Sequence, residues 1–302
     1  MRALIKTCGK DIRIQGRLLR IARLEADKYQ FLDNPKAVLD GLRQREERID
    51  LFTFMQKPPF TTPQHDYPME WDNLAVLPIT TFEHWWNHQL GFKARNKGKQ
   101  AEKKGVVVRE VPFDDAFVKG IQEIYNECPI RQGRRFKHYG KDINTVYKEE
   151  ATFLDSSIFA GAFWGDTLIG FTKLVCDETQ TQAGLMNIVS MMRHRDKAAT
   201  NALIAQAVRS CAERRISFLV YSNFAYRQGQ KTGISDFKER NGFQRVDLPR
   251  YYVPLTRFGW VGFRLGLHHR VVDYFPESLA DKVRGVRELW YNRWYQSQTG
   301  PV

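Results

Sequence analysis

Apolar and polar positions change period twice within residues 184–243, and this stretch organises the second half of the chain. Residues 185–192 are a run of Leu, Met, Ile and Val of strand length, and residues 216–221 are a second such run. The region between them predicts a helix, because its apolar residues recur at helical spacing. These residues are Leu203, Ile204, Ala207, Val208 and Cys211.

A short basic turn at residues 193–200 links the first predicted strand to this helix. Its cations are Arg193, Arg195 and Lys197. The first N–H groups of a helix have no intrahelical partner, so a helix N-terminus is a natural site for an anion. The turn therefore predicts contact with a phosphate group.

A short helix at residues 236–241, ended by Gly242, and a strand at 250–255 complete the pattern. This order resembles the GNAT superfamily of N-acyltransferases over residues 106–255. The resemblance implies an α+β fold with a GNAT-like mixed, mostly antiparallel central sheet flanked by helices. It also implies that the basic turn holds the pyrophosphate of acyl-CoA, for example acetyl-CoA. The residues expected to bind this cofactor are Val189, Ser190, Met191, Arg193, Arg195, Lys197, Ala198, Ala199 and Thr200.

Two positions depart from the GNAT pattern. The family turn has a small residue at its last position, where this chain has Thr200, whose side chain hinders a close backbone approach. Many acetyltransferases have Phe-Tyr in the last helix, with the Tyr as general acid, whereas this chain has Phe237 and Lys238. We expect Lys238 and Asn223 to be the catalytic residues. The alternative is that Lys238 is one exposed residue of a charged helix.

The segment at residues 92–105 carries six cations against one glutamate. It predicts a solvated helical face or a surface that contacts phosphates. Its end, AEKKGV, followed by the strand VVVREV, resembles the Fem-type aminoacyl transferases, as does the Phe-Lys pair. That resemblance implies transfer of an amino acid from aminoacyl-tRNA to an amine of a peptidoglycan precursor, with a lysine that serves in the transfer.

Fem-type proteins usually carry two GNAT domains, whereas this chain of 302 residues has room for one full copy and a curtailed one. We expect an N-terminal β-α-β companion at residues 1–91, a GNAT-like domain at 92–255 and a basic, aromatic helical extension at 256–302. In the companion, strands are expected at residues 12–24 and 49–55, with a helix at 35–47.

A polar loop at residues 128–141 occupies the position that lines the acceptor side in the superfamily. Arginines beside a tyrosine suit a phosphate or carboxylate that also stacks on a ring. The alternative is a charged surface loop. The expected substrate-binding residues are Arg131, Gln132, Arg134, Arg135 and Tyr139.

Two histidines, His84 and His88, stand four residues apart, which is metal-ligand spacing on a helix. No Glu or Cys at a ligand position beside both histidines is evident, so we expect packing residues and no metal. In the extension, aromatic residues alternate with basic ones. This pattern predicts a membrane-interface segment, a surface that stacks on nucleic acid, or a helix packed on the main domain.

The net charge of +13 favours a polyanionic partner, although it also serves solubility. The four cysteines are scattered, which argues against a disulfide framework and for a reducing compartment. No apolar run reaches transmembrane length and no signal peptide is evident, so we expect a cytoplasmic protein, with peripheral membrane contact through the extension.

The sequence leaves three hypotheses about function open. The first is an N-acyltransferase that forms an amide bond on a small-molecule or cell-envelope amine, with acyl-CoA or aminoacyl-tRNA as donor. The second is a catalytically silent GNAT fold that binds RNA, including tRNA. The third is a membrane-surface partner of a glycan or lipid assembly system.

Overall fold

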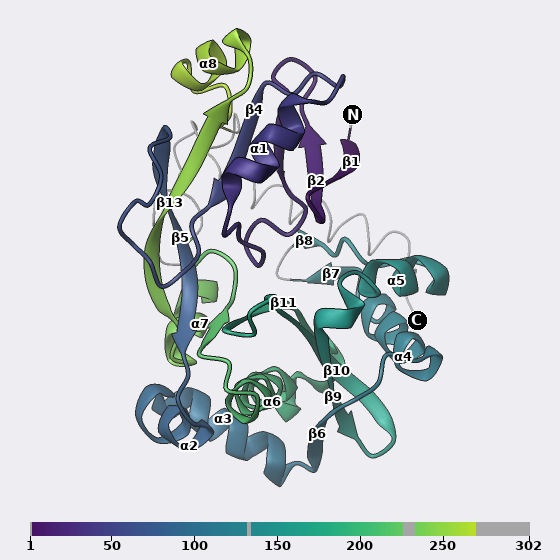
Figure 1. Cartoon of the computed structure of the whole chain (residues 1–302). Helices are drawn as coiled ribbons and strands as arrows, with labels where there is room; N and C mark the ends of the chain where they lie inside the picture. The colour runs from purple at the N-terminus through teal and green to yellow at the C-terminus, as the bar shows by residue number, and fades with distance from the viewer. Residues whose placement is uncertain (1, 132–133, 226–232, 270–302) are drawn as a thin grey trace. The chain divides into compact units, whose positions relative to one another are not determined.

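The computed structural model describes residues 2–131, 134–225 and 233–269 (Figure 1). These residues form two compact units. Unit 1 takes in the residues up to 96, together with 174–186 and 207–269, and unit 2 takes in residues 97–173 and 187–206. Each unit combines separate stretches of the chain, so the units do not test the predicted domain boundaries, which stay a prediction.

Unit 1 is built on strands in the order β1-β2-β3-β4-β13-β5-β12, and β12 also pairs with the beginning of β11. Most neighbours are antiparallel, and the parallel pairs are β3 with β4 and β11 with β12. The strands are β1 Arg2–Thr7, β2 Lys10–Gln15, β3 Ile21–Leu24, β4 Leu51–Met55, β5 Met69–Pro78, β12 Phe218–Val220 and β13 Gln244–Pro254. The helices are α1 Pro35–Arg43, α2 Phe82–His84, a π-helical turn Trp85–Gln89, α7 Gly233–Arg240 and α8 Arg257–Arg264.

The β-α-β elements expected near the N-terminus are present as β3, α1 and β4. The Asn34 side chain accepts from the N–H of Ala37 at the start of α1, and Pro35 follows as the first helical residue. Two details of the prediction are wrong. The helix ends at Arg43 rather than near residue 47, and residues 12–24 form two strands. Gly16 separates them because its φ of +104° is a left-handed conformation that glycine tolerates.

Strand β5 lies between β12 and β13 and pairs antiparallel with both. A strand hydrogen-bonded on both edges and covered on both faces reads as a continuous apolar run. Leu74, Ala75 and Leu77 in β5 are accordingly 0% exposed. Residues 106–255 therefore do not complete their sheet alone, because a strand from before residue 92 is inserted among the expected GNAT strands.

Unit 2 contains β6 Val106–Glu110, antiparallel to β9 Ser157–Trp164, with β10 as the next strand. The predicted hairpin around Gly165 and Asp166 is confirmed with the expected strand bounds. Helices α4 Asp115–Asn126 and α5 Ile143–Glu150 pack beside these strands (Figure 1) and contribute Phe117, Ile121 and Val146 to one buried core.

Four elements run through both units and join them along the chain. They are α3 Phe92–Lys103, β10 Thr167–Cys176, β11 Gln182–Ser190 and α6 Ala199–Glu213. Strands β11 and β12 pair in parallel over three residues, from Gln182 opposite Phe218 to Gly184 opposite Val220. The predicted α+β class, with a mostly antiparallel sheet flanked by helices, is confirmed.

The basic, aromatic extension is only partly described. Its first helix, α8, begins after Thr256, whose hydroxyl accepts from the N–H of Gly259. The helix expected at residues 277–296 lies outside the described residues. Among the helices that are described, none is long and apolar enough to cross a membrane.

Candidate functional site

Lys238 of α7 is 0% exposed, so the alternative of a solvated helix residue is wrong. Its Nζ donates to the backbone oxygen of Asn223 at 2.5 Å and lies 4.5 Å from the centre of the Tyr221 ring. An ammonium group over an aromatic face is held by the quadrupole of the ring. The two residues expected to be catalytic are therefore in direct contact.

A tight backbone turn after β12 fixes Asn223. Tyr221 donates its N–H to Ala75 and Ser222 accepts the N–H of Ala75, so the chain leaving β12 stays bonded to β5. Ser222 has a φ of +51°, a left-handed conformation that costs free energy for a residue with a Cβ. The turn directs the Asn223 side chain toward β5, where its Nδ2 donates to Asp72 Oδ1 at 2.8 Å.

A second lysine joins the site from the turn between β3 and α1. The Nζ of Lys28 donates to Asn223 Oδ1, so Asn223 accepts from Lys28 through its side chain and from Lys238 through its backbone. Burial, together with the smaller effect of the charge of Lys28, lowers the pKa of Lys238 to about 7. Lys238 therefore changes charge close to neutral pH.

Arg250 of β13 completes this network beneath Asn223. Its Nε donates to Asp72 Oδ2 at 2.8 Å and one terminal nitrogen donates to Asp27 Oδ2 at 3.1 Å. Burial alone would lower the pKa of Arg250, but the charges of Asp27 and Asp72 outweigh it and raise the pKa. The guanidinium thus stays charged and holds Asp72 against Asn223. We name Lys28, Asp72, Asn223, Lys238 and Arg250 the lysine network.

The arrangement suits chemistry in which negative charge develops. Two ammonium groups meet at one fixed asparagine, and one of them is buried with a pKa near 7. A preorganised cation in a low-dielectric site stabilises an oxyanion far more than it would in water.

The basic turn of unit 2 has the form expected of a helix start. A 3-10 helix, Met192–Lys197, leads to Ala198 with a φ of +54°, and α6 begins at Ala199. The Thr200 hydroxyl lies 2.8 Å from that of Ser190, so this side chain ties the turn to the end of β11.

An internal carboxylate already lies at the start of this turn. Glu127 accepts the N–H groups of Met192 at 3.0 Å and of Arg193 at 2.6 Å. Arg131 donates to the Ser190 carbonyl at 2.6 Å and to Ile124 at 2.8 Å. Arg131 is therefore held by two backbone carbonyls and lies 3.4 Å from the Glu127 carboxylate, and its role as a substrate ligand stays a prediction.

The other expected donor-site residues take several positions. Met191 is buried and donates its N–H to Ile169, Ala199 is buried, and Val189 packs against the same core. Arg193 and Arg195 are exposed, whereas the Nζ of Lys197 lies 3.8 Å from the centre of the Trp164 ring. Of these three cations, Arg193 and Arg195 are the ones whose side chains are exposed to solvent.

The acceptor loop forms a short antiparallel hairpin of β7 Ile130–Arg131 and β8 Arg134–Arg135. Gln132 lies outside the described residues. Arg135 and Tyr139 are exposed, and binding of substrate by this loop stays a prediction.

The histidine pair of the π-helical turn is close, with the rings of His84 and His88 5.1 Å apart. It has no third ligand among the described residues, where the one group suited to a metal ion is Glu70, His268 and His269.

No family model matches the chain, and no curated protein matches it in sequence. Solved structures do match. The C-terminal domain of a proposed lysylphosphatidylglycerol synthetase from Agrobacterium fabrum is 14% identical, with a TM-score of 0.57 over 87% of each chain.

Two further structures match to a similar degree. The L-PGS from Bacillus licheniformis is 11% identical, with a TM-score of 0.55 over 85% of each chain. FemX is 10% identical, with a TM-score of 0.56 over 82% of this chain and 87% of its own. With the strand pattern and the basic turn, these likenesses show that the chain has the GNAT fold and that it resembles Fem-type proteins in structure.

Proposed function

We propose that the chain is a transferase that moves an acyl group from an activated donor to an amine and forms an amide bond. The observation that carries the proposal is the buried Lys238 held against Asn223. Burying a lysine ammonium costs stability, and ionisable groups with shifted pKa values gather at functional sites, so the burial of Lys238 supports a role in chemistry.

In the proposed reaction the acceptor amine attacks the carbonyl carbon of the donor. A C–N bond forms, the C–O bond of an aminoacyl ester breaks, and the proton lost by the amine ends on the ribose hydroxyl that leaves. Negative charge develops on the carbonyl oxygen in the transition state. The ammonium of Lys238 stabilises that charge, while Lys28 and Asp72 fix Asn223.

We propose aminoacyl-tRNA rather than acyl-CoA as the donor. Two observations support this choice. Glu127 places a negative charge against the N–H groups at the start of the turn, where it repels a pyrophosphate. Thr200 places a branched side chain where GNAT proteins that bind CoA have a small residue. FemX and the lysylphosphatidylglycerol synthetase domain share the fold, which is consistent with this choice.

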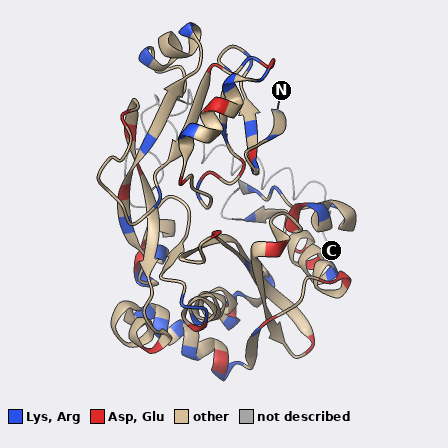
Figure 2. Ribbon diagram, in the orientation of Figure 1, with Lys and Arg blue, Asp and Glu red and all other residues tan. Residues whose placement is uncertain are grey.

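The tRNA would be bound by exposed cations along α3 and the basic turn, and Figure 2 shows Lys and Arg gathered on α3. Lys93, Lys97, Lys99 and Lys103 of α3 are exposed, as is Arg195. Each cation that neutralises a phosphate releases counterions, so the binding should weaken steeply with salt.

Replacing Lys99 and Arg195 by Gln is expected to lower tRNA affinity and to reduce the slope of log K against log salt by about 1 for each lost contact. Filter binding at several salt concentrations measures both quantities. Arg43→Gln on α1 is the matched control, because this exposed arginine pairs locally with Asp40. Equal slopes in all variants would exclude these residues from the tRNA surface.

The donor itself is identified by mass spectrometry of ligands retained on purification, followed by a screen of aminoacyl-tRNA and acyl-CoA donors. The proposal predicts amide product from an aminoacyl-tRNA. Product formed only from acyl-CoA would support the transferase activity but contradict aminoacyl-tRNA as the donor. Tight tRNA binding without product from any donor would favour the second candidate, a silent RNA-binding protein, which the exposed cations of α3 also support.

We further propose that the acceptor is presented at a membrane surface. Helix α8 exposes Phe258, Trp260 and Val261 between Arg257 and Arg264. An aromatic, apolar face flanked by cations lies readily in the interface of an anionic bilayer. Co-sedimentation with anionic vesicles tests this, and binding unchanged by Trp260→Ser would contradict it.

A further inference from the structure

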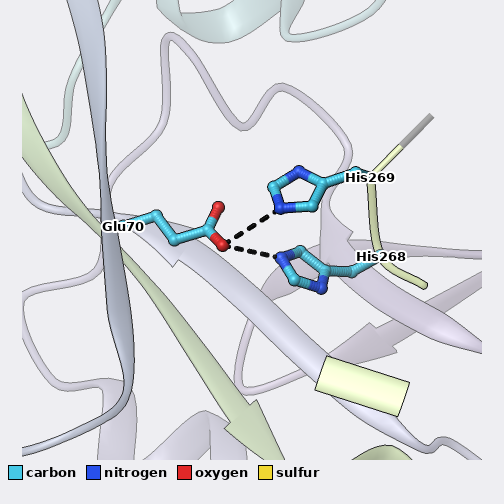
Figure 3. A group of neighbouring side chains, drawn as sticks. All are labelled: Glu70, His268 and His269. Atoms are coloured by element: carbon cyan, nitrogen blue, oxygen red, sulfur yellow. Dashed lines mark hydrogen bonds and ion pairs between the residues drawn. The ribbon is translucent and has the colours of Figure 1, made fainter. Parts of the chain in front are cut away.

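Three side chains with metal-ligand chemistry converge at one edge of unit 1, outside the lysine network (Figure 3). Glu70 Oε1 lies 2.9 Å from His268 Nε2 and 3.2 Å from His269 Nε2. Donor atoms around a tetrahedral zinc ion, with bonds of about 2.0–2.2 Å, lie roughly 3.3–3.5 Å apart. The two separations are about 0.1–0.6 Å shorter than that spacing, and all three donor atoms lie within 4.8 Å of one another, so they are close enough to share one ion.

The backbone explains why two consecutive histidines turn back to β5. Helix α8 ends at Arg264, Gly266 follows with a left-handed φ of +69°, and Leu267 donates its N–H to Gly262. This bond is the one that closes a helix C-terminus and reverses the chain. His268 then packs between Tyr252, at 4.6 Å, and Phe263, at 4.9 Å between ring centres.

The environment holds His268 firmly and leaves the group open to ions. The His268 side chain is 2% exposed, whereas those of Glu70 and His269 are 35% and 37% exposed. A buried imidazole fixes the direction of its lone pair, and the two open neighbours give an ion a path from solvent.

The carboxylate of Glu70 is a further feature that suits a bound cation. Among the described residues its ion pairs are with His268 and His269, and no Lys or Arg lies within ion-pair distance. The Glu70 carboxylate therefore faces two imidazole nitrogens.

We propose that Glu70, His268 and His269 bind a divalent transition-metal ion of the zinc class through one carboxylate oxygen and two Nε2 atoms. Imidazole and carboxylate donors suit zinc, and three protein ligands leave a fourth position for water. The ion joins β5 to the chain that follows α8, so its role is to hold the start of the C-terminal segment. The proposal does not depend on the transferase activity.

The test uses the full chain without an affinity tag, treated with a chelator and dialysed. Calorimetric titration with zinc sulfate is expected to show one ion per chain, confirmed by elemental analysis after gel filtration. Zinc at a hundredfold excess over its Kd should raise Tm by roughly 5 °C, because an ion that binds only the folded state stabilises it.

Glu70→Gln and His268→Gln are expected to weaken zinc binding at least tenfold and to abolish the rise in Tm. The matched control is the double variant His84→Asn and His88→Asn, which removes the other close histidine pair and should bind zinc as the wild type does. Circular dichroism and the urea midpoint without metal show that each variant folds. Absence of stoichiometric binding, or equal binding by Glu70→Gln, would mean that the group is a hydrogen-bonded cluster only.

Discussion

Replacing Lys238 by Met lowers the rate of acyl transfer by about a hundred- to a thousandfold, which corresponds to about 2.7–4 kcal/mol of transition-state stabilisation. Met fills most of the volume of the lysine stem and removes the charge that faces the developing oxyanion. Single-turnover transfer from a labelled donor measures the loss. Lys148→Met, an exposed substitution on α5, is the control and should leave the rate unchanged.

Because the pKa of Lys238 is lowered by burial, the stability of the wild type should depend on pH in a way that the stability of Lys238→Met does not. The pKa of Lys238 is about 7 in the folded chain and about 10.4 in the unfolded chain, so between these values the unfolded state binds more protons. The free energy of unfolding of the wild type should therefore rise relative to that of Lys238→Met as pH increases from 7 to 10. Below pH 7 the difference should be constant. A difference that stays flat from pH 7 to 10 would show that Lys238 is not buried as described.

Replacing Arg250 by Met lowers the free energy of unfolding by about 3–5 kcal/mol, because two carboxylates are left in a partly buried site without their cation. Asp27 and Asp72 are 14% and 26% exposed, and Arg250 pairs with both. Urea denaturation at pH 7 measures the change. The variant should also slow transfer, since Asp72 then loses the contact that holds it against Asn223.

The matched control lies on the same strand. Arg245 of β13 pairs with Asp247, but both side chains are about half exposed, so Arg245→Met should cost less than about 1 kcal/mol. Equal losses for the two variants would contradict the burial that distinguishes them. If Arg250→Met loses stability but transfers at the wild-type rate, Arg250 and Asp72 have a structural role and do not contribute to catalysis.

The parts of the fold that depend on local periodicity could be predicted from the sequence. The hairpin around Gly165, the crossover between β3 and β4, and the turn before α6 follow from apolar runs, caps and turn residues close together in the chain. The place of β5 between β12 and β13 could not be predicted in this way. Its partners lie more than a hundred residues further along, and an apolar run does not say which strands it joins.

In the candidate site, too, contacts between residues far apart in the chain could not be predicted from the sequence. Lys238 can be predicted from the resemblance carried by the Phe-Lys pair, whereas Lys28 and Asp72 cannot, because no spacing in the sequence links them to Asn223. The sequence around Arg131, with a glycine and other arginines nearby, predicts a substrate ligand. In the structure its terminal nitrogens donate to the Ser190 and Ile124 carbonyls, which only the folded chain brings near Arg131.

The central claim is that this GNAT fold transfers an aminoacyl group with the help of Lys238. The most direct measurement is the amount of amide product formed from radiolabelled aminoacyl-tRNA and an added amine by the wild type and by Lys238→Met. The account predicts product with the wild type and a rate about a hundred- to a thousandfold lower with the variant. No product from any aminoacyl-tRNA, or equal rates for the two proteins, would contradict it.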